Sequence, residues 1–183
     1  MSEEELHVPH GAHGDSPLGQ WVAIFTAILA ALGAVVGFEG GHLMNEVLLK
    51  KNEAVLRKTE ATNEWSHYQS TSTKAHLVEL AQELVPSERA AGLDEKLKKY
   101  GTEKEELMAK ARALDAASSH ADHEAEDLNR PHERLAMAMI FLQIAISIAS
   151  ITALTQRRWL FIVAIVSALA GATLCASALL TGG

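Results

Sequence analysis

Three apolar runs without a charged residue constrain this chain more than any other feature. They cover residues 21–38, 135–155 and 159–180. Each is close to the ~20 residues that a helix needs to cross the hydrocarbon core of a bilayer. Trp21 and Trp159 stand at the ends of two runs, where indole side chains prefer the headgroup layer. The sequence therefore predicts an all-α integral membrane protein with three transmembrane helices.

The first run fits a transmembrane helix better than a signal peptide. The first run could be a signal peptide, but no basic residue precedes it and it is long for such a segment. Residues 1–20 are an acidic, histidine-rich tail, which we expect to be disordered. Cys175, in the third run, is the only cysteine and cannot form an intrachain disulfide. Residues 39–134 form one long connection between the first and second runs.

Basic residues predict the orientation of the spans, because lysine and arginine stay on the cytoplasmic side of a membrane. The connection between the first two spans carries six of them near its ends: Lys50, Lys51, Arg57, Lys58, Arg130 and Arg134. The link between the second and third spans carries Arg157 and Arg158, which favour the opposite orientation. The larger group predicts a cytoplasmic connection and an N-terminus outside.

Residues 39–134 are predicted to fold into an antiparallel helical hairpin between spans one and two. Pro86 lies near their middle, and the residue before a proline avoids helical geometry. Ser87 can then cap a second helix. The two arms, 42–84 and 88–129, are nearly equal in length, as a chain that returns to the membrane requires. We therefore place the turn near residue 86.

Both arms carry a series of residues at alternating steps of three and four, the spacing of a coiled-coil seam. In the second arm the series is Ala90, Leu93, Leu97, Tyr100, Lys104, Leu107, Ala111, Leu114, Ser118, Ala121, Ala125 and Leu128. In the first arm the matching series is Leu49, Asn52, Leu56, Thr59, Asn63, Ser66, Ser70, Thr73, Leu77, Leu80 and Leu84. Its polar middle would bury little apolar area, so we expect copies of the hairpin to pack side by side.

Small residues recur every fourth position in the first and third spans, which allows close helix contact in lipid. We expect some of these residues, together with two aromatic residues of the first arm, to join copies in a homo-oligomer. They are Gly33, Gly37, Trp65, Tyr68, Ala164, Ala168, Ala172 and Ala176. Alternatively, the small residues pack between spans of one chain, and the aromatic pair covers the partner arm of the same hairpin.

Histidines and carboxylates at the base of the hairpin could bind a metal ion. A turn near residue 86 brings the two ends of the hairpin together. The candidate ligands are Glu39, His42, Glu46, His123 and Glu126. Imidazole and carboxylate groups from two helices can hold zinc, or a pair of iron ions in helical bundles. We favour the simpler interpretation, a solvated charged surface without a cofactor.

The remaining chemistry is sparse. The net charge of −7 argues against nucleic acid as a partner. The spans are nearly free of ionisable groups, which argues against a transporter. A homo-oligomeric pore lined by Ser147, Ser150 and Thr152 stays open as an alternative. The chain has no glycine-rich phosphate loop, nucleophile elbow or CxxC pair, so we assign no catalytic residue and do not expect an enzyme.

Several short motifs occur in order along almost the whole chain. They are the histidine-rich acidic tail, Asn45-Glu46 with Leu48-Leu49-Lys50, Trp65-x-x-Tyr68-Gln69 with Ser72-x-Lys74, Leu142-Gln143-Ile144-Ala145 and Arg157-Arg158-Trp159. In this order they resemble an uncharacterised family of small bacterial three-span membrane proteins, a domain of unknown function. The resemblance implies a bacterial source, and hence the inner (cytoplasmic) membrane. It brings no catalytic residue.

These features predict a membrane-anchored coiled-coil protein that self-associates and acts as a structural scaffold or accessory subunit. One alternative is a metal-binding or ion-conducting oligomeric membrane protein. Another is an accessory subunit of a larger, heterologous membrane complex. The expected partners are the lipid bilayer and further copies of the chain.

Overall fold

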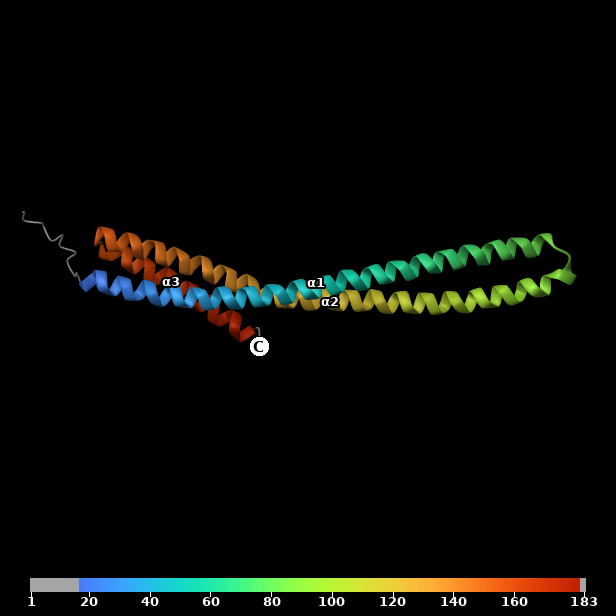
Figure 1. Cartoon of the computed structure of the whole chain (residues 1–183), viewed down its shortest axis with the longest axis horizontal. Helices are drawn as coiled ribbons and strands as arrows, with labels where there is room; N and C mark the ends of the chain where they lie inside the picture. The colour runs from blue at the N-terminus through green and yellow to red at the C-terminus, as the bar shows by residue number, and fades with distance from the viewer. Residues whose placement is uncertain (1–16, 182–183) are drawn as a thin grey trace, which may run out of the picture. The chain divides into compact units, whose positions relative to one another are not determined.

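The computed structural model describes residues 17–181, without the side chains of residues 87–91 and 181. Most of the predicted tail therefore lies outside the described residues. The described chain is entirely helical and has three helices (Figure 1). They are α1 (Pro17–Leu84), α2 (Ser87–Thr155) and α3 (Arg158–Thr181). The predicted all-α class is thereby confirmed.

The helices are longer than the predicted elements. α1 begins at Pro17, earlier than predicted, because proline fits the first turn of a helix, where its missing N–H costs nothing. α1 also continues through Gly40 and Gly41, and α2 continues through Pro131. Pro131 is buried, and its ring removes one backbone hydrogen bond from the helix without ending it. The predicted boundaries between spans and hairpin are therefore not helix ends.

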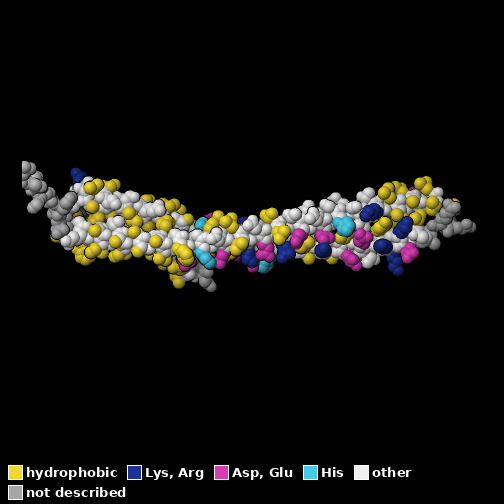
Figure 2. Space-filling view, viewed as in Figure 1, with side chains coloured by type: hydrophobic (Ala, Val, Ile, Leu, Met, Phe, Trp, Pro, Cys, Tyr) yellow, Lys and Arg dark blue, Asp and Glu magenta, His cyan; other side chains and the backbone are white. Residues whose placement is uncertain are grey.

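The chain divides into two compact units. The apolar unit comprises the described residues up to 40 together with residues 133–181, and the hairpin unit comprises residues 41–132. Figure 2 shows hydrophobic side chains over the visible face of the apolar unit and charged side chains over that of the hairpin unit. Each of the three helices contains a stretch that is long and apolar enough to cross a membrane, judged by length and composition.

A cluster of small and aromatic residues joins the three helices of the apolar unit. Val22 of α1, Ala149 of α2 and Ala164 of α3 are buried together. Phe25 and Phe161 pack beside them and meet edge-on, with ring centroids 5.3 Å apart. Because alanine is small, the helices can come close enough for the two aromatic rings to fill the remaining space.

α3 lies close to α2 around Gly171. A Cβ atom at this position would lie 3.0 Å from the carbonyl oxygen of Ala138. Four residues earlier, Ser167 donates its hydroxyl to the carbonyl oxygen of Phe141 at 2.8 Å. The chain reverses between α2 and α3 at Gln156, whose φ of 52° lies in the left-handed region. A short turn and a glycine contact therefore bring α3 back along α2.

The hairpin unit pairs α1 with α2 in antiparallel order. The break between the helices falls at Val85-Pro86, where the sequence predicts the turn. Buried residues recur at every seventh position: Val47, Ala54 and Ala61 on α1, and Ala111, Ser118 and Ala125 on α2. Since these side chains are small, the backbones lie close, and the Ser118 hydroxyl donates directly to the carbonyl oxygen of Ala54 at 2.8 Å.

The buried positions agree with the predicted seam on the second arm but not on the first. On α2 the buried members of the predicted series are Leu107, Ala111, Ser118, Ala121 and Ala125. On α1 the prediction is wrong, because Leu49, Leu56 and Leu77 are 69%, 56% and 61% exposed. The buried residues of α1 lie two positions earlier in the chain. Two residues turn a helix through about 200°, so the predicted series occupies the opposite face of α1.

Candidate functional site

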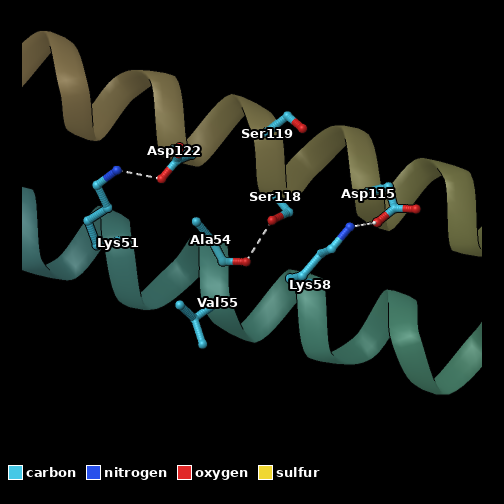
Figure 3. A pocket seen from close by; sticks show the side chains of 8 residues that line it. All are labelled: Lys51, Ala54, Val55, Lys58, Asp115, Ser118, Ser119 and Asp122. Carbon is cyan, nitrogen blue, oxygen red and sulfur yellow. Dashed lines mark hydrogen bonds and ion pairs between the residues drawn. The ribbon is translucent and has the colours of Figure 1, made fainter.

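Charged residues line one side of the contact between the arms of the hairpin. Lys51 and Lys58 lie seven residues apart on α1, and Asp115 and Asp122 lie seven apart on α2, so each pair shares one helix face. The Lys51 Nζ lies 2.6 Å from the Asp122 Oδ1, and the Lys58 Nζ lies 2.9 Å from the Asp115 Oδ1 (Figure 3). These two ion pairs connect the antiparallel arms at two points seven residues apart.

A groove of about 330 Å³ lies between the two ion pairs. Its remaining lining residues are Ala54, Val55, Ser118 and Ser119. Figure 3 shows Ser118 directed to the backbone of Ala54, which closes the floor of the groove. Because each lysine of the groove is matched by an aspartate, it presents no excess charge to an ionic ligand. Its chemistry is that of an inter-helix contact.

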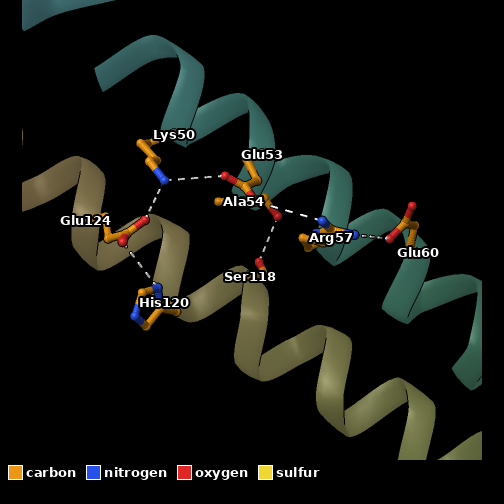
Figure 4. Close-up of polar contacts among 8 residues, drawn as sticks. All are labelled: Lys50, Glu53, Ala54, Arg57, Glu60, Ser118, His120 and Glu124. Carbon is orange, nitrogen blue, oxygen red and sulfur yellow. Dashed lines mark hydrogen bonds and ion pairs between the residues drawn. The ribbon is translucent and has the colours of Figure 1, made fainter. Parts of the chain in front are cut away.

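A second set of charges surrounds Lys50 (Figure 4). Its Nζ lies 2.7 Å from the Glu124 Oε2 on the other arm and 3.6 Å from the Glu53 Oε2 on its own helix. Glu124 also faces His120 at 3.6 Å, and Glu53 also faces Arg57 at 3.9 Å. Glu53 and Glu124 therefore each lie next to two basic side chains in this part of the hairpin.

The contacts between the arms favour the charged forms of Lys50, Glu124 and Asp115. The hydrogen bond between Lys50 and Glu124 raises the pKa of the lysine and lowers the pKa of the carboxyl. The pKa of the Asp115 carboxyl is also lowered, first by the hydrogen bond from the Trp65 indole and then by the one from Lys58. A general acid or base would need a pKa moved toward neutrality. The shifts go the other way, as expected for structural ion pairs.

Trp65 and Tyr68 take part in the same contact between arms. The Trp65 Nε1–H donates to the Asp115 Oδ2 at 2.9 Å, and the indole meets the Tyr68 ring edge-on with centroids 5.7 Å apart. Lys104 of α2 lies over the Tyr68 ring, 5.5 Å from its centroid. Both aromatic residues thus cover the partner arm of their own hairpin. A contact of this pair with another copy stays a prediction.

Most of the small residues predicted to join copies face other helices of their own unit. Gly33 and Gly37 lie against the Met139 side chain, and a Cβ at Gly37 would stand 2.9 Å from its Cε. Of the predicted alanines of α3, three are buried or half-buried: Ala164, Ala168 and Ala172. Ala176 is exposed. Close packing of most of these residues thus occurs within the chain, and their contact with another copy stays a prediction.

One face of α2 in the apolar unit carries polar side chains. Gln143, Ser147 and Ser150 are exposed, whereas Thr152, the third residue of the predicted pore lining, is buried. The Ser147 and Ser150 hydroxyls each donate to the carbonyl oxygen four residues earlier at 2.9 Å. The Gln143 side-chain amide has no hydrogen-bond partner among the described residues. It is therefore available to another molecule.

The candidate metal ligands lie in two separate pairs and one single residue. The His42 Nδ1 lies 3.8 Å from the Glu46 Oε1 on α1, and the His123 Nδ1 lies 3.8 Å from the Glu126 Oε2 on α2. Glu39 belongs to the apolar unit. Among the side chains that the structure describes, no three from histidine, cysteine, aspartate or glutamate lie close enough together to hold a metal ion. Metal binding by these five residues stays a prediction.

Neither the apolar runs nor the heptad series in the sequence singles out the two Lys–Asp pairs. Their signal is nonetheless present, because the partners of each pair lie almost equally far from Pro86 along the chain. In an antiparallel hairpin, residues equally distant from the turn come to lie opposite one another. The turn position gives the register of the two arms, but the pairs can be predicted only when the face of α1 that meets α2 is also known.

Comparisons with curated proteins and with solved structures found no match. One family model does match, and it covers residues 18–181, which include nearly all of the three helices. Its description assigns no function and so adds no site residue to those above. Because the match extends over most of the chain, this protein belongs to the DUF4337 family, a domain of unknown function.

Proposed function

We propose that this protein is a membrane-anchored coiled-coil protein that self-associates and acts as a structural scaffold or accessory subunit. The observation that carries the proposal is the outward apolar surface found on both units. In the apolar unit it fits contact with lipid, and in the hairpin unit it fits contact with another protein surface.

The outer face of the apolar unit is made of large hydrophobic side chains. They include Trp21, Ile24, Ile28, Val35, Phe38, Ile140, Ile144, Ile151, Leu154, Ile162, Val166 and Leu169. A soluble monomer rarely exposes an apolar surface of this extent. In a bilayer the same surface faces hydrocarbon, which supports a membrane anchor made of three helices.

The hairpin unit buries mostly small side chains, whereas several of its leucines are exposed. Alanines such as Ala54, Ala61 and Ala111 are the most frequent of its described buried residues, and each contributes about one methyl group. Burial of a CH₂ group stabilises by about 0.8 kcal/mol, whereas a whole leucine side chain contributes about 1.5–3 kcal/mol. The leucines of α1 that could supply this larger contribution are exposed, so association between copies would stabilise the hairpin.

Gln143 adds an independent reason for association in the apolar unit. An amide facing lipid has no water to bond with, so leaving it unpaired costs free energy. Glutamine side chains in transmembrane helices are known to hydrogen bond across helix contacts. A second copy that presents its own Gln143 would satisfy both amides.

Co-purification of two differently tagged full-length copies from membranes in mild detergent tests the proposal. We expect each tag to recover the other copy and native mass spectrometry to show a defined homo-oligomer. A chain that stays monomeric at every protein concentration would contradict self-association.

The same sample distinguishes the alternatives. A heterologous protein present in fixed ratio would favour an accessory subunit of a larger complex. Stoichiometric zinc or iron that is lost in the His42→Ala, His123→Ala double variant would favour a metal-binding protein.

A further inference from the structure

The face of α1 that points away from α2 carries a second regular series of residues, which we call the outer stripe. Its members are Leu49, Asn52, Leu56, Thr59, Asn63, Ser66, Ser70, Thr73, Leu77, Leu80 and Leu84, and all are exposed. We propose that the outer stripe pairs with the outer stripe of a second copy, in a parallel and in-register coiled coil. The proposal rests on the proposed function, because copies anchored in one membrane orientation have their α1 helices running in the same direction.

The spacing of the outer stripe is that of a two-stranded coiled coil. Alternating steps of three and four residues continue through five heptads of α1 without a break. One such series suffices for the contact with α2, and that series is the buried one through Ala54 and Ala61. A second unbroken series on the opposite face is what a helix needs in order to bind a second partner.

The charges of α1 favour an identical partner. In a parallel, in-register pair, each residue of the outer stripe faces its own counterpart, so a charged residue would meet its like. The outer stripe contains none. The residues on one flank of the stripe in its first four heptads are also uncharged: Leu48, Val55, Thr62 and Gln69. These flank residues face the other flank of the partner, which includes Glu53 and Glu60, so no like charges oppose each other.

Three of the four hydroxyl groups in the middle of the outer stripe can be covered without loss of a hydrogen bond. Thr59, Ser66 and Thr73 each donate to the backbone carbonyl oxygen four residues earlier, at 2.9 Å. A buried donor costs free energy only when it is unpaired. A partner helix can therefore lie over these three residues and leave them satisfied.

Two asparagines provide the specificity of the pair. The side-chain amides of Asn52 and Asn63 have no hydrogen-bond partner among the described residues. Asn63 occupies the heptad position that also holds Leu49, Leu56 and Leu77, the position usually called a. An asparagine at a single a position pairs with its counterpart and fixes the register and number of strands of a coiled coil. A second copy satisfies both amides, whereas a lipid surface does not.

Cysteine cross-linking tests the arrangement in the full-length chain. The background variant Cys175→Ala removes the native thiol, and Leu56→Cys or Leu77→Cys then places one thiol on the outer stripe. A parallel in-register pair brings identical residues within disulfide distance, so each variant should form a covalent dimer under mild oxidation in membranes. The matched control is Ala113→Cys, an exposed residue on the outward face of α2, which should stay monomeric.

Charge substitution tests the same contact without oxidation. The double variant Leu56→Glu, Leu77→Glu sets like charges against each other in two layers and should weaken association at least about tenfold. Helix content should not change, because both leucines are exposed in the single chain. The control Ala109→Glu, Ala113→Glu, on the outward face of α2, should associate like the unmodified chain.

The outcomes separate this inference from the proposed function. If the chain forms a homo-oligomer but neither cysteine variant cross-links and the glutamate variant still associates, the outer stripe is not the contact and self-association stands. The Leu56→Cys and Leu77→Cys variants can also be produced together in one membrane. Cross-links that join one variant to the other, without links between identical positions, would show an antiparallel pair and overturn the inference. A monomeric chain would overturn both.

Discussion

At Gly171 the absence of a side chain decides how closely α3 can approach α2. The carbonyl oxygen of Ala138 lies 3.0 Å from the place where a Cβ atom would stand, and backbone atoms cannot move aside as a flexible side chain can. Ser167 adds a hydrogen bond to the same helix from four residues away. Gly101, in the hairpin unit, has nothing within 4 Å of the corresponding place. The two glycines therefore predict opposite responses to alanine.

Gly171→Ala should destabilise the chain by about 1–3 kcal/mol, because the added methyl group forces α3 away from α2. Gly101→Ala is the matched control and should stabilise α2 by about 0.5–1 kcal/mol, since alanine is the better helix former. Thermal unfolding in detergent, followed by circular dichroism, measures both. Equal stability of Gly171→Ala and the unmodified chain would contradict the close contact.

Acidification should weaken the contact between the arms of the hairpin through Asp115. Its carboxyl has a lowered pKa in the folded chain, so its ionised form stabilises the hairpin. That stabilisation is fully present above the pKa of an unfolded aspartate and disappears as the pH falls through the lower, folded value. Melting temperature measured against pH should therefore fall on the acid side, and Asp115→Asn should flatten the fall.

The control for this titration is Asp127→Asn. The Asp127 carboxylate lies 3.9 Å from Arg130 on its own helix. This ion pair does not connect the two arms, so Asp127→Asn should leave the fall of the melting temperature at acidic pH unchanged. An equal flattening by both variants would mean that general charge, not the Trp65–Asp115–Lys58 contact, causes the fall.

At the scale of the element, α1 has two faces with heptad spacing, and either could pack against α2 by its periodicity. One is lined by Val47, Ala54 and Ala61, the other by the leucines and asparagines of the outer stripe. The alanine face is selected because its small side chains let the backbones approach, as the Ser118–Ala54 hydrogen bond shows. It also places Lys51 and Lys58 beside their aspartates. Close approach and matched charge act together on this face.

Exchange of one ion pair tests whether these charges set the register. Lys51→Asp places two acidic groups opposite each other and should lower the melting temperature of the hairpin. The double variant Lys51→Asp, Asp122→Lys restores opposite charges and should recover most of the loss. Unfolding curves of the single and double variants measure this coupling. No recovery in the double variant would mean that Lys51 and Asp122 act independently.

At the scale of the whole molecule, the proposed anchor and the basic residues predict a defined orientation in the membrane. Six lysines and arginines near the ends of the hairpin region favour the cytoplasm, against two between α2 and α3. The hairpin unit also holds the ion pairs that solvent must surround. We therefore expect the hairpin unit in the cytoplasm and the start of α1 on the other side.

Thiol labelling of intact spheroplasts measures this orientation. In the Cys175→Ala background, Gly101→Cys places an exposed thiol on the hairpin unit with open space around it. A membrane-impermeant maleimide should label it only after permeabilisation. Gln20→Cys, exposed near the start of α1, should be labelled in intact spheroplasts. The reverse pattern would show that the Arg157–Arg158 pair determines the orientation.

Local patterns in the sequence were sufficient for much of this architecture. The three apolar runs predict helices that could span a membrane, and Pro86 marks the break between α1 and α2. The heptad series of the second arm coincides with its buried face, through Ala111, Ser118 and Ala125. Each of these depends on neighbours in the chain: a run of apolar residues, a proline that cannot continue a helix, or one periodic face.

The tertiary structure alone decided what depends on two segments at once. Both faces of α1 have heptad spacing, so periodicity cannot tell which of them meets α2. The leucines of the outer face predict a buried contact more strongly than the alanines of the inner face do. The sequence does not show which residue accepts the Trp65 N–H, and in the folded hairpin the acceptor is Asp115 of the other arm. The choice depends on how near two backbones can come and which charges then meet, and those distances exist only in the folded hairpin.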